Sequence, residues 1–148
     1  MPANPRQTKI LFAALLVLAA VAIAYAVSEN RPWRVPEEAK QRRNPIPPSA
    51  AALAAAKSIY SDKCANCHGD TGKGDGADAK SYYPNPSNLS DPSHLNTVTD
   101  GELFYKISEG HKPMPTFKRK LSEEQRWQLV LLLRSFAAAS SPAGHTQP

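Results

Sequence analysis

Residues 64–68 read Cys64-Ala65-Asn66-Cys67-His68, and this stretch contains the only two cysteines of the 148-residue chain. Two thiols three positions apart, followed at once by an imidazole, match the C-x-x-C-H pattern of c-type haem attachment. At a helix end, this spacing places both thiols on one face, where they can bond the two vinyl groups of one porphyrin. The histidine then lies under the iron. The pattern predicts one haem c, bound covalently through Cys64 and Cys67 and ligated by His68.

Other uses of a C-x-x-C pair fit this sequence less well. A thioredoxin-like redox pair follows a strand, whereas an alanine-rich, helical segment precedes Cys64. A structural zinc site needs four ligands, and the chain has no further cysteine. One possible pair also cannot form a disulfide framework.

The second iron ligand is predicted from a methionine loop. The chain has two methionines, and the one that is not the initiator is Met114, in His111-Lys112-Pro113-Met114-Pro115. The flanking prolines hold it in a stiff, non-helical loop, whereas a core methionine acts as flexible filler. We therefore interpret Met114 as the sixth ligand, with His68 opposite it. His111 and His94 are the rival ligands for a bis-histidine site.

Helix signals dominate the C-terminal two thirds of the chain. Ser49 is a typical N-cap, and Thr99-x-x-Glu102 and Ser122-x-x-Gln125 are capping boxes. The predicted helices cover residues 49–63, 99–110 and 122–136. No run alternates long enough to predict a strand, and residues 69–98 are interpreted as an ordered loop. The expected fold is all-α, a small helical domain wrapped around its cofactor.

The N-terminal part contains one long apolar run at residues 10–27. As a helix it is about 27 Å long, close to the ~30 Å hydrocarbon layer of a membrane. Ala24-Tyr25-Ala26 resembles a signal-cleavage site, but it lies inside the run with no polar stretch before it. The sequence favours a single transmembrane anchor, with a secretory signal as the alternative.

Composition divides the chain into five predicted parts. Residues 28–48 contain five prolines and are expected to form a semi-extended tether with a reach of up to ~60 Å, unless part of it packs on the domain or on a partner subunit. The parts are a cytoplasmic N-terminus (1–9), the anchor (10–27), the tether (28–48), the haem domain (49–139) and a disordered tail (140–148). The net charge of +5 lies mostly beside the apolar run, which favours membrane flanking over nucleic-acid binding.

Residues 50–138 resemble a class I monohaem cytochrome c domain. The resemblance is carried by C-A-N-C-H-G, the glycine run 72–76, the P-N-P-S-N-L segment, K-P-M-P and the closing helix with Trp127. It implies an all-α fold on one haem, electron transfer rather than catalysis, and redox proteins as partners, including a respiratory complex. It also implies export before haem attachment.

The resemblance implies further roles for individual residues. In the family, a proline carbonyl hydrogen-bonds the ring of the haem-ligating histidine, a role that falls to Pro84 or Pro86 here. Trp127 and Leu103 would supply the contact between helices that braces the domain.

Export places the haem domain in the periplasm of a bacterium, with the anchor crossing the inner membrane once. Basic residues in 28–48 outnumber those in 1–9, and by charge bias alone they would leave the domain in the cytoplasm. We give the export implied by the haem motif more weight than the charge bias, and therefore expect a periplasmic haem domain. The expected function is therefore a membrane-anchored electron carrier. The alternatives are a fixed haem subunit of a larger membrane oxidoreductase, and a sensor or enzyme with an open haem site.

Four basic residues surround the methionine loop: Lys112, Lys118, Arg119 and Lys120. They are interpreted as a positive surface that steers an acidic partner, and the alternative is a solvated basic turn before a helix.

Overall fold

The computed structural model describes residues 5–29 and 33–140. Its regular elements in these ranges are helices, and the one bridge between extended residues joins His111 and Met114. This confirms the predicted all-α class. The chain forms two compact units that divide between Arg34 and Val35, and each is described by itself.

The first unit contains one long helix, α1 (Pro5–Glu29). Its segment Pro5–Tyr25 has a mean hydropathy of 2.2 and is long and apolar enough to span a membrane. The large apolar side chains from Ile10 to Tyr25 are 60–70 % exposed, so the described residues of this unit leave them uncovered. An apolar helix that is uncovered on all sides suits a lipid environment.

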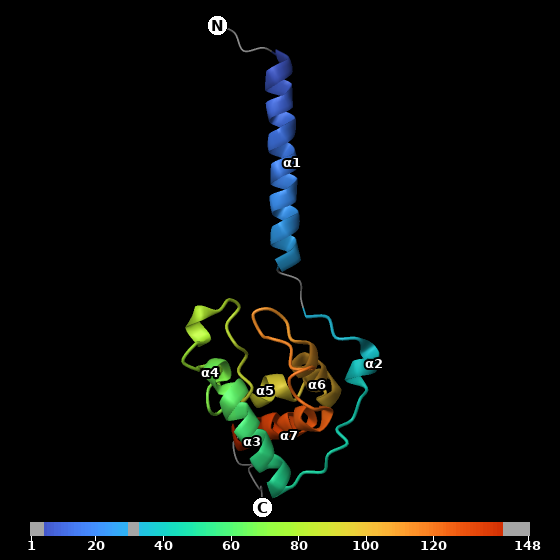
Figure 1. The fold of residues 1–148 in the computed structure, drawn as a ribbon, viewed down its shortest axis with the longest axis vertical. Coiled ribbons are helices and arrows are strands. Elements are labelled where there is room, and N and C mark those ends of the chain that lie inside the picture. The colour runs from blue at the N-terminus through green and yellow to red at the C-terminus, as the bar shows by residue number, and fades with distance from the viewer. Residues whose placement is uncertain (1–4, 30–32, 141–148) are drawn as a thin grey trace, which may run out of the picture. The chain divides into compact units, whose positions relative to one another are not determined.

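The described residues of the second unit form three longer helices and four short helical elements (Figure 1). The longer helices are α3 (Ala50–Lys63), α6 (Asp100–Glu109) and α7 (Glu123–Ser140), and α3 packs extensively along α7. The short elements are α2 (Glu37–Lys40), α4 (Ala65–His68), the 3₁₀ turn η1 (Ala79–Ser81) and α5 (Pro92–Leu95).

The predicted caps start the three longer helices. The Ser49 side chain accepts a hydrogen bond from the first turn of α3, and Thr99 accepts one from the Glu102 amide at 3.1 Å. Ser122 and Gln125 form a reciprocal capping box before α7, with bonds of 2.8 and 3.1 Å. Each bond satisfies an amide that has no partner within the helix. Local hydrogen bonding therefore sets where these helices begin.

The C-terminal end of α7 differs from that expected. Helix α7 continues to Ser140, because small residues with good helix propensity follow Phe136. The first residue of the predicted tail 140–148 is thus helical. Residues 141–148 lie outside the described residues, as do residues 1–4.

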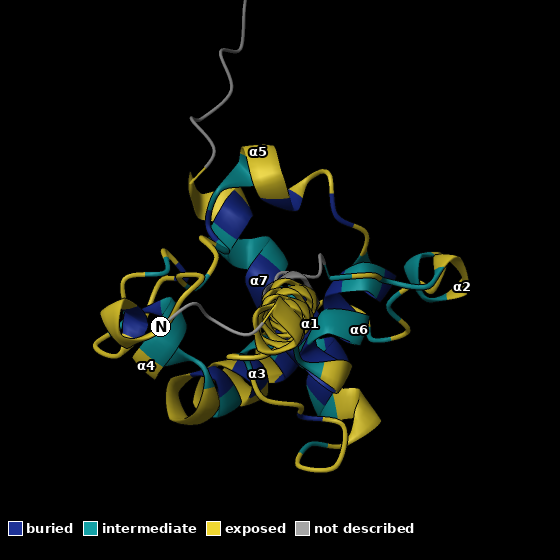
Figure 2. Ribbon diagram, turned by 90° about the horizontal axis from the view of Figure 1, so that it is seen from above, coloured by how far each residue is buried: buried dark blue, intermediate teal, exposed yellow. Residues whose placement is uncertain are grey.

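Aromatic pairs hold the core between α3, α6 and α7. Trp127 stacks on Phe104 with ring centroids 4.0 Å apart, and Tyr60 meets Phe136 edge-on at 5.1 Å. Leu103 is buried in the same core, but the ring partner of Trp127 is Phe104. In Figure 2 the buried residues lie on the inward faces of these helices and the exposed residues face outward.

Arg134 ties α7 to the turn between α5 and α6. Its guanidinium donates to the Asp100 carboxylate at 2.7 Å and to the carbonyls of Leu95 and Val98 at 2.5 and 2.6 Å. One half-buried side chain thus satisfies three acceptors at the end of the long loop, as the forked guanidinium geometry permits.

The predicted loop at 69–98 is ordered but contains two short helical elements, η1 and α5. The Asp91 side chain caps α5 through the Ser93 amide at 2.9 Å, and Pro92 occupies the first turn. The Ser93 hydroxyl bond also lowers the pKa of Asp91. A single helical turn carries too few residues to show an apolar period, which is why the pattern did not predict it.

The last two thirds of the predicted tether lie against the domain. Residues 35–48, called the strap from here on, belong to the second unit, and their short helix α2 packs against α6. The sequence is compatible with a free tether or with one that packs partly on the domain, and the structure shows that residues 35–48 pack on it.

Candidate functional site

The two cysteines lie where α3 ends and α4 begins. Cys64 is the C-cap residue of α3 and the N-cap residue of α4. Its carbonyl oxygen accepts hydrogen bonds from the amides of Cys67 and His68 at 3.1 and 2.9 Å. Both thiols are free and half-buried. Burial, with a smaller effect of Cys67, raises the pKa of Cys64 to about 11. A protonated, half-buried thiol is not suited to act as a catalytic nucleophile.

The imidazole of His68 is fixed through one of its two nitrogens. Nδ1 lies 3.1 Å from the Ser87 carbonyl oxygen and, as the protonated nitrogen, donates to it. The other nitrogen, Nε2, is then the basic one and can bind a metal. Burial lowers the pKa of His68, which keeps the ring neutral at pH 7.

The partner of His68 corrects a sequence expectation, because neither Pro84 nor Pro86 provides the carbonyl. The Pro86 carbonyl lies against Gly74, so closely that a Cβ atom at Gly74 would be 2.4 Å from its oxygen. With that carbonyl directed at Gly74, the next one along the chain, that of Ser87, reaches the imidazole.

The glycine run after the motif fixes the end of α4. The amides of Gly74 and Gly76 donate to the carbonyls of His68 and Cys67 at 2.8 and 3.2 Å. These carbonyls are among those that a helix C-terminus leaves without partners. Gly74 has a φ of +78°, in the left-handed region that favours glycine. The run therefore holds the ligating residues in place through backbone bonds.

Gly74→Ala is expected to lower the free energy of unfolding by about 1–3 kcal/mol, because it adds left-handed strain and a clash with the Pro86 carbonyl. It should also shift the reduction potential, since Ser87 would move relative to His68. Urea denaturation and a redox titration measure the two effects. Lys73→Ala, at an exposed neighbouring position, is the control. Equal stability of the two variants would contradict this role of Gly74.

Met114 is half-buried at the edge of the core, in the loop between α6 and α7. Its backbone exchanges two hydrogen bonds with that of His111, at 2.8 and 3.0 Å, and so closes a tight turn. The turn holds the methionine in place, as the proline flanks predicted. Of the rival ligands, His111 is half-buried beside it, whereas His94 is exposed on α5.

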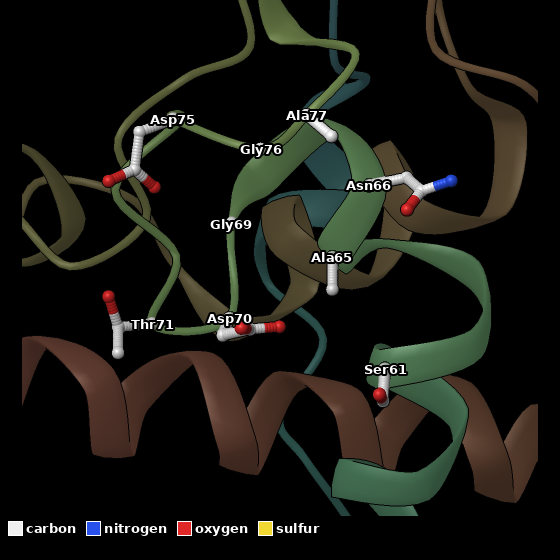
Figure 3. A pocket seen from close by; sticks show the side chains of 9 residues that line it. All are labelled: Ser61, Ala65, Asn66, Gly69, Asp70, Thr71, Asp75, Gly76 and Ala77. Atoms are coloured by element: carbon white, nitrogen blue, oxygen red, sulfur yellow. The ribbon is translucent and has the colours of Figure 1, made fainter.

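A polar cavity of about 600 Å³ lies beside α4, and Figure 3 shows its lining. Ala65 and Asn66 of α4 line it together with residues of the 69–77 loop, including the carboxylates of Asp70 and Asp75. Neither cysteine lines this cavity, and neither do His68 and Met114. It is therefore distinct from the candidate site. Across residues 5–29 and 33–140, no group of three or more His, Cys, Asp or Glu side chains could hold a metal ion.

The donor set matches the chemistry of haem c. Two free thiols are available for thioether bonds, and one neutral imidazole has its second nitrogen open. A thioether is held in a rigid turn at the core edge. These are the donor types that a covalently attached, protein-ligated haem would use.

The family described as "Cytochrome C oxidase, cbb3-type, subunit III" matches residues 51–133, more than half of the chain. The chain belongs to this family. Membership implies a cytochrome c domain, which confirms the predicted haem c. Cys64 and Cys67 have the spacing of the C-x-x-C-H motif. Haem-based electron transfer follows from the family.

A solved structure shows a similar fold. A chain titled as part of the "Kuenenia stuttgartiensis reducing HAO-like protein complex" is 24 % identical, with a TM-score of 0.55. The match covers 74 % of this cbb3-type chain and 53 % of that chain, so it spans about half of the other protein. A comparison with curated proteins gives no match.

Proposed function

We propose that the chain is a membrane-anchored monohaem cytochrome c that passes single electrons between periplasmic or membrane redox partners. The observation that carries the proposal is the fixed imidazole of His68, whose Nδ1 is held by the Ser87 carbonyl directly after the two attachment cysteines. When bound, haem c supplies an iron that alternates between the ferrous and ferric states.

In this proposal each haem-binding residue has its own role. Cys64 and Cys67 would attach the cofactor, and His68 and Met114 would hold its iron. The glycine run orients His68, and the closed 111–114 turn orients Met114. If these two residues held the iron from both sides, no position would be open for a substrate. This arrangement favours a carrier over an enzyme or a gas sensor.

A ligand-exclusion experiment tests this function. The oxidised full-length protein is expected to bind neither cyanide nor imidazole at millimolar concentration, and to show one reversible one-electron wave. Optical titration and protein-film voltammetry measure these properties. Rapid, tight cyanide binding by the wild-type protein would instead support the sensor or enzyme hypothesis.

The proposed location is a bacterial inner membrane, crossed once by α1, with the haem domain in the periplasm. The length, apolarity and full exposure of Pro5–Tyr25 support an anchor. The orientation rests on the export that haem attachment requires.

A second candidate function is a permanent haem subunit of a larger membrane oxidoreductase. The family favours it, because its description is that of an oxidase subunit. Co-purification of further subunits in mild detergent would distinguish this role from that of a free carrier.

The basic residues around Met114 are proposed to steer the partner. Lys112, Arg119 and Lys120 are exposed, whereas Lys118 pairs with Glu109 at 2.8 Å and is partly neutralised. Charges at the rim of an interface act mainly on the association rate.

Lys112→Glu is expected to slow electron transfer to the physiological partner by about 3–10-fold at low salt, with little change in potential. The difference should vanish at high ionic strength, because the screening length shrinks from ~30 Å at 0.01 M to ~10 Å at 0.1 M salt. Stopped-flow kinetics across salt concentrations measure this, with Lys57→Glu on the exposed side of α3 as the control. A wild-type rate that does not depend on salt would refute steering and favour the permanent subunit.

A further inference from the structure

We infer that the strap, residues 35–48, holds the haem domain within one short linker of the membrane and so commits it to a redox partner fixed at that membrane. This inference rests on the proposed anchoring by α1. It concerns where the domain can reach.

The strap meets α6 by backbone contact at Gly101. A Cβ atom there would lie 2.0 Å from the Ala39 carbonyl oxygen and 2.8 Å from that of Arg42. Nearby, the Thr99 hydroxyl donates to the Lys40 carbonyl at 2.7 Å. Figures 1 and 2 both show α2 beside α6. Glycine within a helix is unfavourable for helix formation, so its presence here fits a surface shaped for close backbone approach.

Arg42 attaches the strap to the aromatic core. The central carbon of its guanidinium lies 4.6 Å from the centroid of the Phe104 ring and 5.2 Å from that of Trp127. The same group donates to the Glu123 carboxylate at 2.5 Å. This hydrogen bond holds the pKa of Glu123 below its usual value. Arg42 thus combines a cation–π contact with a charged hydrogen bond across two helices.

Asn44 and Ile46 continue the contact. The Asn44 amide nitrogen donates to the Trp127 carbonyl at 3.0 Å, and its oxygen accepts from the Ile46 amide at 2.9 Å. The Ile46 side chain packs against the core. The strap is therefore attached at successive points from residue 39 to residue 46.

Docking shortens the reach of the domain. Helix α1 ends at Glu29 and the second unit begins at Val35, which leaves five residues between them. Whatever their conformation, these residues span at most ~20 Å at 3.3–3.6 Å each, against ~60 Å for a free 28–48 tether. A soluble partner can diffuse to the domain and does not need a short linker. A partner embedded in the membrane needs the domain to stay close to it, and the docked strap keeps the linker to the domain short.

Two substitutions can undock the strap while leaving the haem ligands intact. Gly101→Ala adds a methyl group that clashes with the strap backbone, although α6 itself favours alanine. Arg42→Ala removes the aromatic and charged contacts. Arg43→Ala is the matched control, because Arg43 is the exposed neighbour with the same charge.

The experiment uses full-length holoprotein in nanodiscs that contain a lipid with a fluorescent headgroup. Quenching of this fluorophore by the haem reports the distance from domain to membrane, and trypsin cleavage near Lys40 reports strap opening. We expect strong quenching and slow cleavage in the wild type and Arg43→Ala. In Gly101→Ala and Arg42→Ala, we expect cleavage at least about tenfold faster and weaker quenching. Wild-type cleavage as fast as in these variants, or unchanged quenching once the strap opens, would overturn the inference.

Inserting a spacer tests whether the redox partner is fixed at the membrane. Inserting a Gly/Ser spacer of about 15 residues between Arg34 and Val35 should slow haem reoxidation by native membranes several-fold and leave reoxidation by soluble ferricyanide unchanged. An unchanged membrane rate would point to a soluble partner and contradict the inference. The haem spectrum of the same samples tests the proposed function separately, since it reports haem attachment and ligation whether or not the strap is docked.

Discussion

Replacing Cys64 and Cys67 together by alanine is expected to abolish covalent haem retention. The variant's haem should be extracted completely by acidified acetone, whereas the wild-type haem should remain with the protein. The domain should also lose most of its cooperative unfolding transition, because a helical unit of this size has a small apolar core and depends on its cofactor for stability. Haem staining after denaturing electrophoresis and circular dichroism measure the two effects.

Asn66→Ala within the same motif is the matched control, because Asn66 is exposed and provides no thiol. It should keep the covalent haem and the unfolding transition. Covalent haem in the double cysteine variant would refute the attachment that we propose.

Met114→His is expected to keep the iron six-coordinate and to lower the reduction potential, because a thioether favours ferrous iron relative to imidazole. The fall should be a substantial part of the ~0.8 V range over which axial ligands set haem potentials. Met114→Ala should leave one position open, so that cyanide and imidazole bind readily. Redox titration and ligand-binding spectra provide both measurements.

The rival ligands supply the controls for this experiment. His111→Ala and His94→Ala should each leave the spectrum unchanged and the potential nearly so. If both Met114 variants behaved like the wild type while a histidine variant lost the low-spin spectrum, the second ligand would be that histidine and the proposed His68–Met114 pair would be wrong.

The helices could be predicted because their signals are local. The caps at Ser49, Thr99 and Ser122 bond to amides within three residues, so the sequence contains both partners. The attachment motif was equally local, since its meaning depends only on spacing. Short elements such as α2 and α5 escaped prediction because one turn has too few residues for an apolar period.

The strap could not be predicted because its partners are distant in the sequence. Arg42 reaches Phe104 and Trp127, more than sixty residues away, and nothing near Arg42 indicates that pairing. One weak signal was present: Glu37 and Lys40 form an i,i+3 ion pair of 3.0 Å after a proline, which is typical of a helical turn. Gly101 within a predicted helix was a second signal, since it indicated a close backbone approach.

The carbonyl that orients His68 was missed by one residue. The resemblance named a proline, and Pro86 is adjacent to the observed Ser87. Which carbonyl points at the imidazole depends on the path of the loop past Gly74, and that path is set by contacts across twelve residues. Spacing along the chain locates such a bond to within a residue or two, and the loop conformation decides which group makes it.

The most direct test of the central claim is the optical and magnetic circular dichroism spectrum of the full-length protein, matured in a host that attaches haem c. We expect one haem c per chain by the pyridine haemochrome assay. We also expect a low-spin ferric spectrum with the charge-transfer band of a methionine–iron bond, and we expect Met114→Ala to lose that band. A high-spin spectrum, or a bis-histidine spectrum that survives this substitution, would contradict the claim.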